Sequence, residues 1–359
     1  MLKIIEFIKN TPNWRQILAE APYHLSINDD ECFIILKYSQ INSDFTIDIV
    51  RECRGLIIDK EYNTVCVPFF KFGNYGEPYA DKIDWSTAKV EEKLDGSLIK
   101  IWNYNGRWVI STNGTIFAKN ASIDSVCDEK YGGKFSNFEE LFKAAADKVG
   151  LVLEKLNPQY TYMFELCSPY NRIVVPHSEI KIYHIGTRDN ITLQELEIDI
   201  GICKPKLYEC NDINALIKMA AELKYCEEGY VVKDGNYRRV KVKSPAYIAA
   251  HLLISDMNDK KLLELLRRNE TAEFLTYFPE YQSFVDNLTN KITRLENEIY
   301  DAQKNFDNVH FETRKDYAAA VLKTKYPHFF FSIYDGKVKT PIEWLWQMSN
   351  SQILEWLGK

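Results

Sequence analysis

Short segments rich in Val, Ile, Tyr and Phe recur through the first three quarters of the chain, and short polar turns separate them. Residues of these types fit strands. The pattern predicts strands at 31–38, 54–59, 64–70, 97–104, 107–112, 160–166, 180–186, 228–233 and 237–242. Asn105-Gly106 predicts a type I′ hairpin between two of them, and Asp234-Gly235-Asn236 predicts a second tight turn. Residues 1–245 are therefore expected to form an α+β domain with antiparallel sheets.

The pattern changes after Pro245, where apolar residues recur at the spacing of one helix face. One long amphipathic helix is predicted from the stripe Val285, Leu288, Ile292, Leu295, Ile299, Ala302 and Phe306. Thr340-Pro341 predicts the start of a last helix, since threonine caps a helix and proline suits its first turn. We expect Trp344, Leu345 and Met348 to face inward there. Residues 246–359 are thus expected to form an all-α accessory domain.

Composition narrows the class of protein. The 359 residues exceed what one hydrophobic core usually organises, so two domains are expected. Hydrophobic residues make up 46% and charged residues 27%, as in a soluble globular protein. No apolar run is long enough to span a bilayer, and the eight cysteines include no C-x-x-C pair. We expect a cytoplasmic protein with reduced thiols, without membrane contact, and a monomer.

The charge distribution is compatible with a local anion-binding site but not with a generally basic surface. The net charge of −6 argues against a protein that coats nucleic acid through a generally basic surface. One segment, 231–243, is nevertheless basic, with Lys233, Arg238, Arg239, Lys241 and Lys243 against Asp234. Such a cluster is commonly a solvated strand face, so it needs further evidence to be read as functional.

The strongest local chemical signal is Lys93-Leu94-Asp95-Gly96-Ser97, just before a predicted strand. A lysine attacks phosphorus only as the neutral amine, and neighbouring cations and desolvation favour that form. Glycine at position 96 would let the backbone pass close to a nucleotide. The alternative is a surface turn of no function.

Further charged residues follow in order along the chain. Glu165 lies in the apolar segment Tyr162-Met163-Phe164-Glu165-Leu166, where a carboxylate needs a partner. Glu228-Gly229 places a second carboxylate at a strand start. Lys241 and Lys243 are alternate residues of a strand, so their ammonium groups share a face. Two like charges side by side repel unless a polyanion lies between them, and a triphosphate is a natural candidate.

This ordered set resembles the nucleotidyltransferase motifs shared by ATP-dependent ligases and mRNA capping enzymes: Lys93-x-Asp95-Gly96, Phe164-Glu165, Glu228-Gly229 and Lys241-x-Lys243. More specifically, it resembles the RNA ligase 1 family first known from bacteriophages. Arg54-Gly55 and Lys71-Phe72-Gly73-Asn74 match segments that precede the lysine in that family, and residues 164–174 are also very similar to their counterpart. The resemblance covers about residues 50 to 247.

The resemblance implies an ATP-dependent RNA ligase with a nucleotidyltransferase domain. Lys93 would carry AMP, Glu228 would bind Mg²⁺, with Mn²⁺ as an alternative, and Glu165 would bind the ribose. Lys241 and Lys243 would hold the α-phosphate, and Arg54 and Lys71 the β- and γ-phosphates. The expected ATP site consists of Arg54, Lys71, Glu92, Asp95, Gly96, Glu165, Tyr183, Val231, Lys241 and Lys243. Among these, Val231 and Tyr183 would sandwich adenine, although either could equally be ordinary core. The partner would be RNA with 3′-hydroxyl and 5′-phosphate ends, joined in RNA repair.

Three positions bear on the alternatives. Many relatives carry an aromatic residue where Gly73 stands and a basic residue where Asn113 stands, which puts a phosphate or RNA contact there in question. Capping enzymes and DNA ligases commonly have arginine two residues after the motif glycine, but this chain has Leu98. That favours RNA ligase over a DNA ligase or a GTP-using capping enzyme. A non-catalytic RNA-binding module on the same fold is the other alternative, and the intact motif lysines and glutamates argue against it. His177 and His184 have no nucleophile motif beside them, so we expect structural roles for both.

Overall fold

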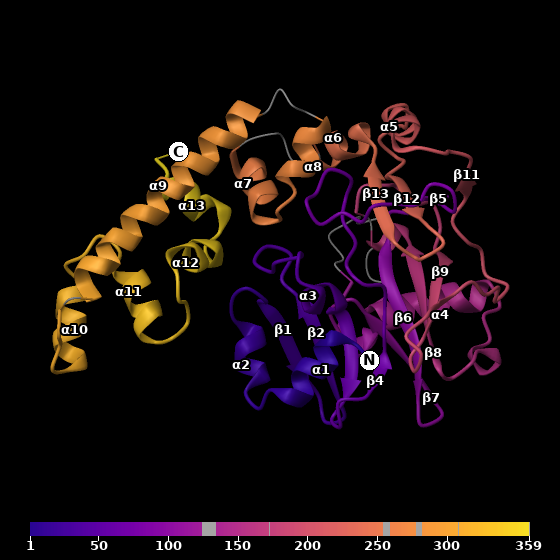
Figure 1. The fold of residues 1–359 in the computed structure, drawn as a ribbon, viewed down its shortest axis with the longest axis horizontal. Helices are drawn as coiled ribbons and strands as arrows, with labels where there is room; N and C mark the ends of the chain where they lie inside the picture. The colour runs from indigo at the N-terminus through magenta and orange to yellow at the C-terminus, as the bar shows by residue number, and fades with distance from the viewer. Residues whose placement is uncertain (124–133, 172, 254–258, 278–281, 308, 359) are drawn as a thin grey trace. The chain divides into compact units, whose positions relative to one another are not determined.

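The computed structural model describes residues 1–123, 134–171, 173–253, 259–277, 282–307 and 309–358. They divide into two compact units, Met1–His251 and Leu252–Lys359 (Figure 1). In the described residues, all strands belong to the first unit and the second unit is helical. The predicted α+β region followed by an all-α region is therefore confirmed. No described helix combines the length and the apolarity that crossing a membrane requires.

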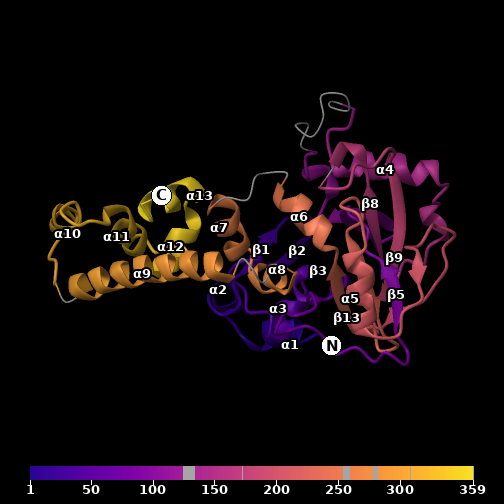
Figure 2. The same ribbon diagram turned by 90° about the horizontal axis from the view of Figure 1, so that it is seen from above.

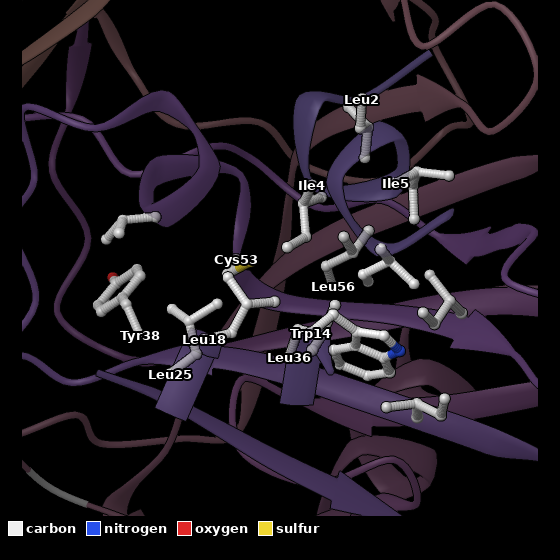
Figure 3. Packing of buried hydrophobic residues seen from close by; sticks show 14 of the residues in the cluster. Leu2, Ile4, Ile5, Trp14, Leu18, Leu25, Leu36, Tyr38, Cys53 and Leu56 are labelled. Atoms are coloured by element: carbon white, nitrogen blue, oxygen red, sulfur yellow. The ribbon is translucent and has the colours of Figure 1, made fainter. Parts of the chain in front are cut away.

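The N-terminal part of the first unit is a four-stranded antiparallel sheet with three short helices. The order is β1 (Leu25–Asp29), β2 (Phe33–Tyr38), β3 (Arg54–Asp59) and β4 (Thr64–Cys66). The helices are α1 (Lys3–Asn10), α2 (Trp14–Ala19) and α3 (Asp48–Glu52). Glu52 accepts hydrogen bonds from the backbone N–H groups of Lys3 and Ile4, which satisfies donors at the start of α1. Figure 3 shows the core beneath, where Ile4, Trp14 and Leu36 pack together.

Two further antiparallel sheets complete the first unit. A five-stranded sheet has the order β10-β9-β8-β6-β7, with bounds Glu195–Leu196, Lys181–Asp189, Tyr160–Cys167, Ser97–Tyr104 and Arg107–Thr112. A four-stranded sheet has the order β11-β5-β12-β13, with bounds Leu207–Tyr208, Lys89–Glu92, Gly229–Lys233 and Arg239–Lys243. Phe33 of β2 meets Trp102 of β6 edge to face at 5.0 Å, so the first sheet and the five-stranded sheet share a core.

Helices cover the outer faces of these sheets. Helix α4 (Phe138–Lys148) packs on the five-stranded sheet, as Figure 2 shows, and Asn137 caps it by accepting from the N–H of Glu140. Helix α5 (Ile213–Ala221) is capped by Asp212 and packs on β13. Helix α6 (Pro245–Leu253) follows β13 directly. The single-turn 3₁₀ segments are Ala118–Asn120, Leu153–Lys155 and Pro169–Asn171.

The second unit is organised around the long helix α9 (Gln282–Asp307). Leu295 and Ile299 of its apolar stripe are buried against Phe329, Trp344 and neighbouring residues. The other helices are α7 (Asp259–Arg267), α8 (Thr271–Tyr277), α10 (Arg314–Val321), α11 (Pro327–Tyr334), α12 (Pro341–Gln347) and α13 (Asn350–Trp356). Thr340 caps α12 by accepting from the N–H of Glu343, as the Thr-Pro pair predicted. The prediction that this is the last helix was wrong, because Ser349 caps α13 in a capping box.

The strand predictions hold best where a turn fixes the register. Strands β3, β6 and β7 have the predicted bounds, and Asn105 and Gly106 both have positive φ, as a type I′ turn requires. The segment predicted as a strand at 64–70 is a strand only as far as Cys66. Strands β1, β5, β10 and β11 were missed. The sequence of β5, KVEE, is short and mostly charged, and its pairing with β12 supplies the strand conformation.

Candidate active site

A cavity of about 480 Å³ lies in the first unit, and all three sheets contribute to its wall. The four-stranded sheet with β5 and β12 supplies Glu91, Val231 and Lys241, and the five-stranded sheet supplies Leu98 and Glu165. Arg54 comes from β3. Of the predicted site residues, the wall contains Arg54, Glu92, Lys93, Gly96, Glu165, Val231 and Lys241. The structure therefore brings together, at one cavity, predicted residues that are far apart along the chain.

Lys93 lies just after β5, where the backbone still pairs with β12. Its N–H donates to the carbonyl of Gly229 at 2.8 Å. Its Nζ lies 2.7 Å from Oε1 of Glu228, and the Lys93 side chain is 19% exposed. The ammonium is therefore held at the cavity wall by a buried carboxylate. An attack by this nitrogen requires the amine to lose its proton and to leave the ion pair.

The strand register explains how β13 presents a cation to the same cavity. Val231 pairs with Glu91 of β5 on one side and with Lys241 of β13 on the other. Directly paired residues share a face of a sheet, so the three side chains line one wall. Burial and the cations around it hold the pKa of Lys241 well below the usual lysine value. These cations are Lys71, Arg54, Lys93 and Lys243.

The Phe72 ring lies close to both Arg54 and Lys241. The guanidinium of Arg54 lies 5.2 Å from the centre of the Phe72 ring, and Nζ of Lys241 lies 4.9 Å from it. Nε of Arg54 is buried and has no hydrogen-bond partner among the described residues. A cluster of desolvated cations with an unsatisfied donor is suited to bind a phosphate group.

Glu165 provides a carboxylate on the opposite wall. It pairs with Leu98 of β6 and with Tyr183 of β9, so the three side chains share a face of the five-stranded sheet. Burial raises the pKa of Glu165 to about 7, with Lys93 lowering it and Glu228 raising it further. A carboxyl group in this environment is well placed to accept hydrogen bonds from a hydroxyl of a bound ligand.

Asp95 does not face the cavity, although it was predicted to bind ATP. Its Oδ2 accepts from the N–H groups of Val174 and Val175 at 2.9 and 2.7 Å, and its Oδ1 accepts from the hydroxyl of Tyr247 at 3.0 Å. His177 Nε2 lies 2.6 Å from the Asp95 carbonyl oxygen. Asp95 therefore fixes the loop that carries Lys93 rather than lining the cavity. Arg172, in the neighbouring segment 164–174, lies outside the described residues.

Gly96 was expected to allow close approach of a nucleotide, and the structure gives a second reason for glycine. A Cβ atom at this position would lie 2.6 Å from the carbonyl oxygen of Leu166 on β8. The loop after Lys93 therefore passes too close to β8 for any larger residue. Gly96 also lines the cavity, so the expected approach of a nucleotide remains a prediction.

Glu228, which pairs with Lys93, and three other predicted residues lie outside this wall. Lys71 lines a second cavity instead, with its ammonium 4.5 Å from the centre of the Phe45 ring. Tyr183 lies beside Glu165 on the sheet, and its ring receives the ammonium of Lys181 at 4.9 Å. Lys243 is close enough to Lys241 to repel its charge but does not contribute to the wall.

The two departures from the family pattern differ in their surroundings. A Cβ atom at Gly73 would lie 2.9 Å from Cα of Ala80, so this chain packs too tightly there for the aromatic residue of its relatives. Asn113 lines the cavity, and its Oδ1 is buried without a hydrogen-bond partner among the described residues. An unsatisfied oxygen at the wall marks a position where a ligand donor fits.

Sequence reasoning missed four residues around the site. Tyr247 is 152 positions from its partner Asp95, and no local pattern could reveal that contact. Phe72 and Arg239 were quoted within motifs or basic segments but not as parts of the wall. Lys100 is fully buried on β6, and its Nζ donates to the carbonyl of Gly55 at 2.5 Å. An apolar strand pattern gives no reason to expect a lysine inside.

The carboxylates at this site suit only a limited part of the coordination of a divalent metal. No group of three or more His, Cys, Asp or Glu side chains in the described residues could hold a metal by itself. Mg²⁺ commonly takes only one or two carboxylates, and phosphates and water supply the remaining ligands. Glu228, with Oε1 against Lys93 at the cavity, fits that limited role.

The family model described as RNA ligase matches residues 52–247. A protein of Autographa californica nuclear polyhedrosis virus, assigned as a bifunctional polynucleotide kinase/RNA ligase, is 34% identical over 268 residues. The match covers 70% of this chain and 38% of that protein, so this chain spans well under half of the viral relative. The RNA ligase of Rhodothermus phage RM378 is 25% identical over 366 residues, which cover 79% of this chain and 81% of the phage protein.

Solved structures show a weaker likeness. An archaeal ATP-dependent RNA ligase matches at 13% identity with a TM-score of 0.42, covering 78% of this chain and 79% of that one. A Naegleria gruberi RNA ligase variant with ATP and Mn matches at 15% identity with a TM-score of 0.36, covering 46% of this chain and 51% of that one. These likenesses are too weak to support structural conclusions.

Proposed function

Because this chain belongs to the RNA ligase family, whose model matches residues 52–247, we propose that it is an ATP-dependent RNA ligase. It would join a 3′-hydroxyl to a 5′-phosphate through AMP bound covalently to Lys93. The observation that carries this proposal is the position of Lys93. Its amine lies at the wall of a cavity that also contains Arg54 and Lys241. A surface turn, the alternative for the Lys-x-Asp-Gly sequence, would not bring these cations together.

In the first step, Nζ of Lys93 forms a bond to the α-phosphorus of ATP while the bond to pyrophosphate breaks. Phosphoryl transfer depends mainly on positioning and on neutralising charge. Lys241 would hold the α-phosphate together with Lys243. Arg54 is placed to hold the phosphates beyond it, and Lys71 would follow in the adjoining cavity. Burial, and then repulsion between the cations, lower the pKa of Lys241, and binding of a polyanion would relieve the repulsion.

The remaining groups would orient the nucleoside and the metal. Glu165 would accept a hydrogen bond from the ribose, with Glu92 at the same wall. Val231 would contact the adenine, and so would Tyr183, which pairs with Glu165 on the sheet. Glu228 would bind Mg²⁺ or Mn²⁺, which neutralises phosphate charge when bound.

In the second step, an oxygen of the RNA 5′-phosphate bonds to the phosphorus of AMP, and the lysine amine leaves. In the third step, the RNA 3′-hydroxyl attacks the 5′-phosphate and releases AMP, which seals the strand. RNA repair in the cytosol, by a monomer, is the setting we propose for this activity.

Leu98 supports RNA ligase over the related classes. It lines the cavity directly beside Glu165, at the position where DNA ligases and capping enzymes commonly carry arginine. A non-catalytic RNA-binding module would not need Lys93 to be placed among phosphate-binding cations.

Strand-joining assays test the proposal. Matched RNA and DNA strands, single and nicked, are incubated with ATP, GTP or NAD at one salt concentration, because phosphate contacts depend on salt. We expect RNA with 3′-hydroxyl and 5′-phosphate ends to be joined with ATP. Faster joining of nicked DNA would indicate a DNA ligase. Transfer of label from GTP would indicate a capping-type enzyme. The absence of covalent label would indicate a non-catalytic binding module.

A further inference from the structure

A second cavity of about 530 Å³ adjoins the nucleotide cavity, because Phe72 and Arg239 line both of them. Lys93 lines only the first cavity. The wall of the second contains the cations Arg51, Lys71, Arg188, Arg238 and Arg239, against the carboxylates Asp81 and Glu195. Asp234 pairs with Arg238 at 2.7 Å, and even with this carboxylate the cations remain in excess. The second cavity therefore attracts anions.

A shared carboxylate and two aromatic rings hold the guanidinium groups of two of these arginines. Arg188 and Arg239 share Glu195, each at 2.6 Å. Their guanidinium groups lie over aromatic rings, Arg188 over Phe70 at 4.2 Å and Arg239 over Phe69 at 4.3 Å. One carboxylate thus forms ion pairs with two cations. In addition, Nε of Arg188 is buried without a hydrogen-bond partner among the described residues. The cavity is preorganised to bind an anion, because its cations do not have to be ordered when the ligand arrives.

AMP is transferred twice, from ATP to Lys93 and from Lys93 to the RNA. The chemistry of these two transfers indicates which anions need a binding site beside the nucleotide cavity. In an in-line displacement, the attacking and leaving groups lie on opposite sides of the phosphorus. When Lys93 attacks ATP, pyrophosphate therefore departs on the side away from Lys93. When the RNA 5′-phosphate later displaces Lys93, it must approach from that same side. Pyrophosphate and the RNA 5′-phosphate consequently use one site in turn.

We propose that the second cavity is this shared phosphate site, and that Arg51 and Arg238 at its wall bind pyrophosphate in the first transfer and the RNA 5′-phosphate in the second. The proposal rests on the proposed ligase function and adds residues to which that function assigned no role. Arg238 is the best probe. Its side chain is 43% exposed, and without it Asp234 would still accept hydrogen bonds from the N–H groups of Asp84 and Asn236.

The test measures binding to the full chain without ATP, with saturating AMP filling the nucleotide cavity. A labelled oligoribonucleotide with a 5′-phosphate is compared with the same RNA ending in a 5′-hydroxyl, at one salt concentration. We expect the 5′-phosphate to tighten binding and pyrophosphate to abolish that increment. Arg238→Gln should weaken both the 5′-phosphate increment and pyrophosphate binding roughly 10-fold, the size of one lost charge-assisted hydrogen bond.

Arg15→Gln is the matched control. Arg15 is 46% exposed and pairs with Asp29 at 2.7 Å, but it lies outside both cavity walls. The Arg15→Gln variant should bind pyrophosphate and the RNA 5′-phosphate as the unmodified chain does. The proposal is overturned if Arg238→Gln also binds both normally, or if it weakens pyrophosphate alone. Adduct formation from labelled ATP is measured in parallel, so a chain that binds these anions but never takes AMP would refute the ligase function and not the phosphate site.

Discussion

The hydroxyl of Tyr247 donates a hydrogen bond of 3.0 Å to Oδ1 of Asp95, and so joins helix α6 to the loop that carries Lys93. Asp95 is 5% exposed and Tyr247 4%, which makes the contact a buried one. The nucleophile motif is thus held by a residue that follows the last strand of its domain. A domain boundary at 245 would separate these two partners, whereas the family model extends to residue 247.

Tyr247→Phe should slow adenylylation of Lys93 roughly 10-fold, because a buried carboxylate loses one hydrogen bond and the loop loses a fixed contact. Single-turnover transfer from labelled ATP measures the rate. The thermal midpoint should fall only slightly, since Val174 and Val175 still donate to Asp95. An unchanged rate would show that α6 does not position the nucleophile.

A chain that ends after Ala250 should still form the Lys93 adduct, because it retains Tyr247 and every motif residue. A chain that ends after Pro245 should form it more slowly. The longer truncation should lose efficiency on a nicked stem-loop RNA more than on an unstructured strand, since recognition is commonly carried by a separate domain. If the soluble, folded chain ending at Ala250 takes no AMP, the helical domain helps to build the nucleotide site.

Lys241→Ala should reduce the rate of adenylylation by about 10² to 10³, because a preorganised cation facing the phosphates is lost. Lys243→Ala should also reduce sealing, although Lys243 acts from outside the wall. Lys89→Ala is the control, since that lysine lies on β5 with its side chain 55% exposed. Circular dichroism checks the fold. Near-normal rates in both variants would show that the pair does not hold the phosphates.

We expect Lys100 to lower the stability of the folded chain at neutral pH. Burial lowers its pKa from 10.5 to about 8, so the charged form is disfavoured in the folded state. The full cost applies below pH 8 and disappears as pH rises from there to 10.5, where the unfolded chain also loses the proton. Cys66 opposes the shift, whereas Arg54 and Lys37 add to it.

Lys100→Met should therefore stabilise the protein at pH 7 by about 2 kcal/mol: the pKa shift corresponds to about 3 kcal/mol, and the lost hydrogen bond to Gly55 offsets about 1 kcal/mol. The gain should shrink at about pH 9.5. Urea denaturation at both pH values measures it. Ser111→Ala, a buried polar change opposite Lys100 on β7, should show no such pH dependence. A methionine variant that is less stable at both pH values would contradict the account.

The sequence predicted those parts of the site that lie within local motifs. Lys93, Glu165 and Lys241 follow recognisable spacings and line the cavity. Strand alternation predicted that Lys243 shares a face with Lys241, but only Lys241 contributes to the wall. Contacts between distant segments were not predictable. The partners of Asp95 lie 79, 80 and 152 positions away, so its structural role emerged only from the fold. Lys71 lines the adjoining cavity, and its neighbour Phe72 lines both cavities, which no spacing rule encodes.

The most direct test of the central claim is the intact mass of the chain after incubation with ATP and Mg²⁺. We predict the addition of one AMP, located on Lys93 by peptide mapping and removed again by pyrophosphate. Lys93→Ala and Lys93→Arg should both lack the adduct; arginine retains a charge that can pair with Glu228 but cannot act as the nucleophile. An AMP adduct that persists in these variants, or none on the unmodified chain, would contradict the assignment of Lys93 as the residue that carries AMP.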